Sequence, residues 1–142
     1  MKTTIMCASS SDDKPQNQIL YLGHLFCGKT HDYTMLKSEF DVKRDWFSDH
    51  HIRIDLGYLG FDKNYPCGGL SLPVKSSKKR PLSEEDKSNN RLLAGQRIVV
   101  EHVIGGMKRY RVLSNRVRSR QWAGYDTKLE VCAGLWNFYV TN

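Results

Sequence analysis

The chain has 142 residues, of which 39% are hydrophobic and 26% are charged, as in a folded domain and unlike a disordered segment. No apolar run is long enough to cross a membrane and the N-terminus lacks a secretory signal, so we expect a cytoplasmic protein without a membrane partner. The net charge is +7; residues 1–74 contain 8 Lys and Arg against 9 Asp and Glu, whereas residues 75–142 contain 14 against 6. Such a basic half fits a polyanion partner, and equally a surface kept basic for solubility.

The first two expected elements are strands. Residues 2–8, KTTIMCA, and residues 18–26, QILYLGHLF, are rich in β-branched and large apolar side chains. The polar segment between them, residues 9–17, contains Pro and reads as a turn, so the pattern predicts an antiparallel hairpin. Asp12 and Asp13 are adjacent in this turn and indicate turn chemistry rather than a carboxylate pair.

A helix is expected next, capped by Thr30 or Asp32 and running through Leu36 and Phe40 towards Trp46. The four cysteines of the chain are far apart and form no pair with zinc-ligand spacing. We therefore expect them to be buried free thiols in a reducing compartment. They are Cys7, Cys27, Cys67 and Cys132.

The segment HHIRIDLGYLG, residues 50–60, predicts a short strand through Ile52 and Ile54 that ends at Asp55 and breaks at Gly57. An Asp at the carboxyl end of a strand, followed by a glycine-rich turn, can present its carboxylate in an open crevice. The same position also suits an ordinary Asp that caps the turn. Both interpretations of Asp55 remain open on this segment alone.

Residues 61–90 connect this strand to a basic helical region. LSLPV, Leu70–Val74, predicts a short edge strand, since proline suits an edge better than the centre of a sheet. After a basic link, Ser83 and Asp86 have the spacing of a helix capping pair. We therefore expect a helix to begin at this point.

Residues 91–120 predict one long helix, or a helix and its continuation, with Glu101 near the middle. Apolar residues recur every three to four positions and predict a buried stripe: Leu93, Val100, Val103, Ile104, Met107 and Val112. Glu101 is either a metal ligand near a phosphodiester or a solvated partner of Arg97, four residues earlier. A second amphipathic helix, residues 126–139, should pack on the sheet with one side formed by Leu129, Cys132, Ala133, Trp136 and Tyr139.

Three blocks of this chain resemble DDE transposases, in particular the bacterial insertion-sequence enzymes related to Harbinger elements. NRLLAGQ followed by RIVVEHVIGGMKRYRVL is similar to the last catalytic block, in which Glu101 takes the place of the triad's Glu. IDLGYLG resembles the block A-D-x-G-Y-x-G of the second triad Asp. The matching positions in that block are Asp55, Gly57, Tyr58 and Gly60. A third block, G-x-x-H-D, is matched by Gly28, His31 and Asp32. We expect His31 and Asp32 to cap a helix locally or to hold the loop by a hydrogen bond.

The resemblance implies an α/β fold, the ribonuclease-H-like (retroviral-integrase-like) catalytic domain. It also implies two-metal chemistry with Mg²⁺ or Mn²⁺, because a pair of divalent ions can activate the attacking oxygen and stabilise the leaving one during strand cleavage. Asp55 and Glu101 would be catalytic metal ligands. The implied partner is DNA, at the transposon ends and at the target. The expected phosphate contacts are Arg97, Lys108, Arg109, Arg116 and Arg118.

The sequence departs from the family pattern at the first triad Asp, which the family places in a V-D-G-T-like block upstream of the first strand seen here. We therefore expect residues 1–142 to be a partial catalytic domain, N-terminally truncated and lacking the first strand. Such a chain would bind metal weakly and be inactive alone, unless an upstream transposase half or a homo-oligomer completes it. A decayed remnant and the second frame of a frameshifted transposase both fit. So do two other classes of protein: a basic nucleic-acid-binding module without catalysis, and a non-transposase nuclease of the same fold.

Overall fold

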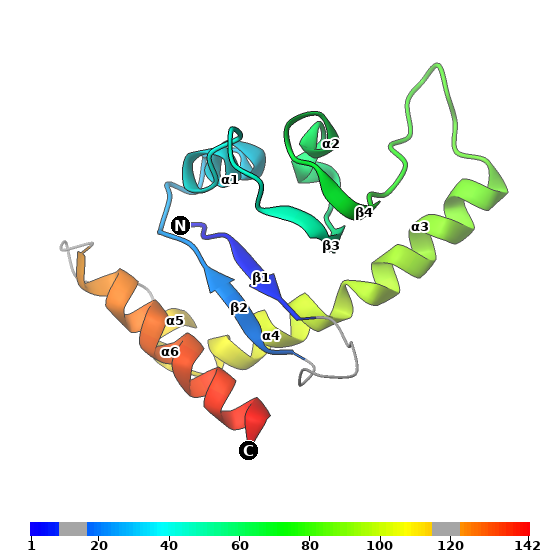
Figure 1. Ribbon diagram of the computed structural model, residues 1–142. Coiled ribbons are helices and arrows are strands. Elements are labelled where there is room, and N and C mark those ends of the chain that lie inside the picture. The colour runs from blue at the N-terminus through cyan, green and yellow to red at the C-terminus, as the bar shows by residue number, and fades with distance from the viewer. Residues whose placement is uncertain (9–16, 115–122) are drawn as a thin grey trace. The chain divides into compact units, whose positions relative to one another are not determined.

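The computed structural model describes residues 1–8, 17–114 and 123–142. The described chain is mixed α/β, with helices and two small sheets, which confirms the predicted α/β class. It divides into two compact units, coloured by residue number in Figure 1. We call Met1–Gly28 with Ile98–Asn142 the hairpin unit, and Lys29–Arg97 the central unit.

The hairpin unit begins with strands β1, Ile5–Cys7, and β2, Ile19–Leu22, which pair antiparallel with Ile5 opposite Leu22. This confirms the predicted hairpin, although residues 9–16, including Asp12 and Asp13, lie outside the described residues. Three helices follow in this unit: α4 (Ile98–Lys108), α5 (Arg111–Ser114) and α6 (Ala123–Thr141). Figure 1 shows α4 and α6 on the hairpin, where α4 contacts β1 and α6 contacts β2.

The core of the hairpin unit lies between the hairpin and these helices. Its buried residues are Ile19, Val103, Met107, Leu129, Cys132, Ala133 and Trp136. Asn137 fastens α6 to β2, since its amide accepts from the Ile19 N–H at 2.8 Å and donates to the Ile19 carbonyl at 2.9 Å. The predicted packing of the last helix on the sheet is confirmed. Tyr139, placed on the buried side by its spacing, is instead 65% exposed; the residue that packs against the core beyond Trp136 is the partly buried Val140.

The central unit contains α1 (Asp32–Glu39), β3 (Phe47–Arg53), the 3₁₀ turn η1 (Leu56–Tyr58), α2 (Phe61–Asn64), β4 (Cys67–Ser71) and α3 (Glu84–Gln96). Strands β3 and β4 pair in parallel, so the chain between them must return to the starting end of the sheet. The turn η1 and the helix α2 make this return. Asp55 lies between β3 and η1, at the carboxyl end of the strand, where this return begins.

Aromatic rings fill the core of the central unit. Phe47, at the start of β3, packs against Phe40, Phe61 and Tyr65 with ring centroids 5.4 to 5.6 Å apart. Phe61 and Tyr65 are each 1% exposed, and the Tyr65 hydroxyl donates to the Phe40 carbonyl at 2.6 Å. Ring pairs at these separations stabilise the fold by more than the burial of their apolar area alone. This cluster fixes the strand from which the Asp55 turn departs.

Several predicted boundaries were wrong. Helix α1 ends at Glu39, well before Trp46, and its cap is His31 rather than Thr30 or Asp32: the His31 Nδ1 accepts from the Tyr33 N–H. Strand β4 precedes most of the predicted Leu70–Val74 strand, because the pairing with β3 already begins at Cys67.

Of the two forms expected for residues 91–120, the described part shows the second, a helix and its continuation. Helix α3 begins earlier, with the predicted capping box of Ser83 and Asp86, and ends at Gln96; α4 ends at Lys108. Only the middle of the apolar stripe is buried: Val103 and Met107 lie in the core, whereas Val112 is 43% exposed.

The cysteines are free thiols, as predicted, but only Cys132 is buried and Cys27 is exposed. None of the helices in residues 1–8, 17–114 and 123–142 is long and apolar enough to span a membrane.

Candidate active site

The Asp55 turn is built by a carboxylate that caps it. The Ile54 N–H still donates to the Ser71 carbonyl, which extends the strand pairing to the residue before Asp55. There the backbone turns, and Asp55 Oδ1 accepts from the Gly57 N–H at 2.8 Å while its carbonyl accepts from the Tyr58 N–H at 3.1 Å. The first Asp55 oxygen is therefore fixed by the turn. The capping interpretation of Asp55 is confirmed, and it leaves the second oxygen for other partners.

Gly57 and Gly60 are glycine for different reasons. Gly60 has φ +91°, a left-handed backbone conformation that glycine adopts readily and that is unfavourable for residues with a Cβ. At Gly57 a Cβ would lie 2.9 Å from Asp55 Oδ1 and 2.9 Å from Asp32 Oδ2. Both carboxylates therefore approach the bare backbone of Gly57. Asp32, the first residue of α1, thus lies beside the Asp55 turn.

Tyr58 is partly buried near these carboxylates. Burial raises the pKa of its phenol to about 12, with smaller contributions from the carboxylates of Asp32, Asp55 and Glu39. An anionic phenolate would be disfavoured by both low polarity and three like charges. Tyr58 consequently stays protonated over the whole physiological range.

Arg97 forms an ion pair with Asp55. Its Nη2 lies 3.7 Å from Asp55 Oδ2, with 44% of the Arg97 side chain and 39% of the Asp55 side chain exposed. Both residues line a cavity of about 260 Å³, together with Leu56, Gly57, Pro73, Asn90 and Ala94. From the sequence, one of the two alternatives for Glu101 was a solvated ion pair with Arg97. In the structure the guanidinium forms an ion pair with Asp55.

Asn90 holds α3 beside this cavity. Its Oδ1 accepts from the Val74 N–H at 2.8 Å and its Nδ2 donates to the Val74 carbonyl at 2.9 Å. One side chain therefore satisfies both backbone groups of a residue that follows β4. This pair of bonds fixes the helix on which Ala94 lines the cavity and which ends at Arg97.

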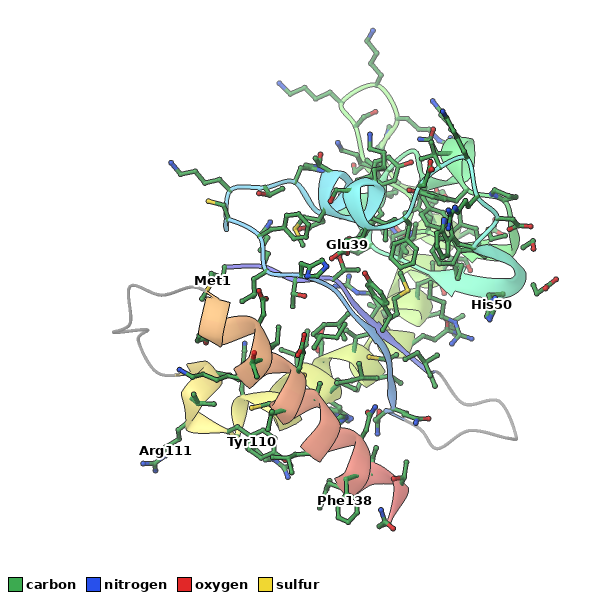
Figure 2. All side chains as sticks on the ribbon, turned by 60° about the vertical axis from the view of Figure 1, so that its left-hand side comes forward. Met1, Glu39, His50, Tyr110, Arg111 and Phe138 are labelled. Atoms are coloured by element: carbon green, nitrogen blue, oxygen red, sulfur yellow. The ribbon has the colours of Figure 1, made fainter. Side chains whose placement is uncertain are left out.

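Glu101 lies on α4 of the hairpin unit, where it is exposed. Lys108 follows seven residues later, so the two side chains share a helix face about 10 Å apart along the axis. Lys108 and Arg109 are exposed, and Figure 2 shows the neighbouring Arg111 pointing away from the ribbon. Helix α4 therefore presents a carboxylate in its first turn to solvent, and cations at its last turn and in the residues that follow. Arg116 and Arg118 lie outside the described residues.

The donor chemistry of Asp55 and Glu101 fits a hard divalent ion, which prefers carboxylate oxygens and retains several waters. Within the described residues no group of three or more His, Cys, Asp or Glu comes together as a ready-made metal cage.

Sequence comparisons place these features in a family. The sequence profile of the DDE superfamily endonucleases matches residues 13–137. The chain belongs to this family. Asp55, Arg97 and Glu101 lie within the matched range. The resemblance stated from the sequence blocks is thereby confirmed.

One relative in this family is a probable transposase for insertion sequence element IS702 from Microchaete diplosiphon, 35% identical to this chain over 123 residues. The aligned region covers 86% of this chain and 42% of the relative, so the chain spans less than half of the relative's length. No solved structure gives a significant match.

Three residues of the site were missed at the sequence level. Asn90 had no signal, because an asparagine inside a helix is an ordinary surface residue until its partner is known. Asp32 had a motif but was interpreted as a local cap, and Tyr58 was quoted only as part of a block.

Proposed function

We propose that this chain supplies the second and third carboxylates of a DDE-type catalytic centre that cleaves and joins DNA strands with divalent metal ions. Family membership supports the endonuclease or transposase class. The observation that carries the proposal is Asp55 itself: a half-exposed carboxylate at a strand end, lining a cavity, with one oxygen fixed by Gly57. Under this proposal the domain is ribonuclease-H-like and extends over residues 1–142 as part of a larger catalytic apparatus.

Asp55 and Glu101 are the proposed metal ligands, with Mg²⁺ or Mn²⁺ as the ions. When bound, such ions activate the attacking oxygen and stabilise the leaving oxygen of an in-line phosphoryl transfer. Asp55 Oδ1 remains with the Gly57 N–H, so Oδ2 is the oxygen that Asp55 offers. The capping bond orients the carboxylate before any ligand arrives, which lowers the entropy lost on binding.

The basic residues are the proposed DNA contacts. Lys108 and Arg109 are exposed at the end of α4, and Arg97 is partly exposed at the cavity. Contacts of this kind bind phosphates and do not read base sequence, so DNA affinity should fall steeply with salt. Arg116 and Arg118 belong to the same proposal on the sequence pattern alone.

The family triad has three carboxylates, and the blocks matched here provide two. We propose that the first Asp comes from another segment, either in a longer product of the same gene or in a second chain. The 142-residue chain alone should therefore bind DNA and a divalent ion weakly without cutting DNA.

The experiment compares nicking of supercoiled DNA by the chain alone and by the chain joined to any upstream sequence that encodes a V-D-G-T-like block. With Mg²⁺ or Mn²⁺, only the joined product should nick. Asp55→Asn and Glu101→Gln should each lower its rate by more than the roughly 10- to 100-fold that an outer-shell residue costs. Asp62→Asn and Glu130→Gln, exposed on α2 and α6, are matched charge controls.

Nicking that survives both substitutions would refute the assignment of Asp55 and Glu101. A second candidate is a nucleic-acid-binding module without catalysis, favoured by the exposed cations at the end of α4. It is the better description if the joined product binds DNA in a salt-dependent manner but never nicks it.

A further inference from the structure

The two oxygens of the Asp55 carboxylate have different partners. Oδ1 accepts a short hydrogen bond from the Gly57 N–H, at 2.8 Å. Oδ2 faces the Arg97 guanidinium at 3.7 Å, which is the distance of a loose ion pair rather than a direct hydrogen bond. Any cation that binds Asp55 through Oδ2 therefore meets Arg97 first.

Arg97 can release this oxygen without unfolding its helix. Its backbone N–H donates to the carbonyls of Leu93 and Ala94, so the main chain at the end of α3 is fixed. Its side chain is 44% exposed, and rotamer changes of exposed side chains take picoseconds to nanoseconds. Asn90 holds α3 in place during such a change through its two bonds to Val74. The guanidinium can thus leave and return to the same position.

The cavity beside the pair has room for the exchange. At about 260 Å³ it can hold several waters, and Asp55, Arg97 and Asn90 contribute polar groups to its wall. A divalent ion that retains most of its waters fits the chemistry of such a space better than a bare ion.

We propose that Arg97 is a positioning residue that competes with the divalent cation for Asp55 Oδ2, so that cation binding and release of the guanidinium are one exchange. This inference rests on the proposed function, since it takes Asp55 as a metal ligand. The released guanidinium becomes available to a phosphodiester, which brings the negative charge that Arg97 has lost. Arg97 thus keeps the carboxylate neutralised and oriented until cation and phosphate are both present.

The test measures cation binding directly and needs no catalysis. The 142-residue chain, labelled with nitrogen-15 glycine, is titrated with Mn²⁺, and paramagnetic broadening of the Gly57 amide signal is followed by NMR. Gly57 is a local reporter because its N–H donates to Asp55. The Gly60 amide, whose shift depends on its left-handed backbone, reports that each variant is folded.

Arg97→Gln should lower the Mn²⁺ concentration at half-broadening by about two- to fivefold, the range expected when a partly exposed ion pair no longer competes. Arg97→Lys keeps the charge and should stay within a factor of about two of the original chain. Arg91→Gln removes the same charge from the exposed part of α3 and should leave the midpoint unchanged. Asp55→Asn should abolish the selective broadening.

The outcomes separate the two proposals. If Asp55→Asn abolishes broadening but Arg97→Gln leaves the midpoint unchanged, the competition is refuted and Asp55 remains a ligand. Equal shifts in Arg97→Gln and Arg91→Gln would indicate a general charge effect and would also overturn the competition. If Gly57 broadens equally in Asp55→Asn, Asp55 is not the ligand and the proposed function fails at that residue.

Discussion

Asn90 offers a sharp test of how the candidate site is held together. Asn90→Ala removes both bonds to Val74, at 2.8 and 2.9 Å, and leaves a backbone N–H and carbonyl without these partners. Each bond contributes a net of about 0.5–1.5 kcal/mol, so the segment after β4 should lose about 1–3 kcal/mol of local stability against α3. The expected result is faster hydrogen exchange at the Val74 amide, by about 5- to 150-fold, because each 1.4 kcal/mol is tenfold in the opening equilibrium.

Asn89→Ala is the matched control, since Asn89 is the preceding residue of the same helix and is exposed. Both substitutions gain the same helix propensity, so the difference between them isolates the two bonds to Val74. Exchange is measured residue by residue by NMR. If Val74 exchanges at the same rate in both variants, the bonds do not secure α3, and the argument that Arg97 returns to a fixed position loses its basis.

Two further predictions concern other parts of the chain. Gly106→Ala would place a methyl group in the indole ring of Trp136, so it should destabilise the hairpin unit by about 1–3 kcal/mol in urea unfolding. Gly105→Ala is the control and should not destabilise the unit, because no atom lies within 4 Å of the added methyl group. Equal stability of the two variants would refute the α4–α6 packing. Because the pKa of Tyr58 rises from 10.0 to about 12 on folding, its contribution to stability is complete below pH 10 and is lost as the pH rises to about 12. Near-ultraviolet titration of Tyr58→Phe should lack one late-titrating phenol, and an unchanged late phase would contradict the assignment.

The sequence was most informative where a pattern is local. The hairpin, the capping box of Ser83 and Asp86, and the buried side of α6 up to Trp136 all follow from neighbouring residues, and all three are confirmed. The Asp55 turn belongs to the same class, because strand, carboxylate and glycines lie within a few positions of one another. Local chemistry decides such elements before the rest of the chain is placed.

Predictions that depend on distant partners were less successful. The predicted stripe continued through Leu93 and Val112, but α3 has no buried residue, and the buried members of the stripe, Val103 and Met107, lie on α4. Periodicity shows which side of a helix is apolar without showing whether another element covers it. The expected pairing of Arg97 with Glu101 failed for a similar reason, since it rested only on their spacing of four residues. Arg97 pairs instead with Asp55, which is distant in the sequence. The bonds of Asn90 to Val74 hold α3 beside the cavity that both residues line.

The two interpretations of Asp55, as a turn cap and as a metal ligand, are compatible because they use different oxygens. A carboxylate with both oxygens in solvent would lose rotational freedom when it bound an ion, and that loss would weaken binding. Here the Gly57 N–H holds Oδ1, so the orientation of Oδ2 is set by the fold. The capping bond also requires a residue without a Cβ at Gly57, where Asp32 and Asp55 both approach the backbone. The glycine-rich turn after the strand therefore fixes Oδ1 and leaves Oδ2 at the cavity, which is the arrangement that the proposed metal ligand needs.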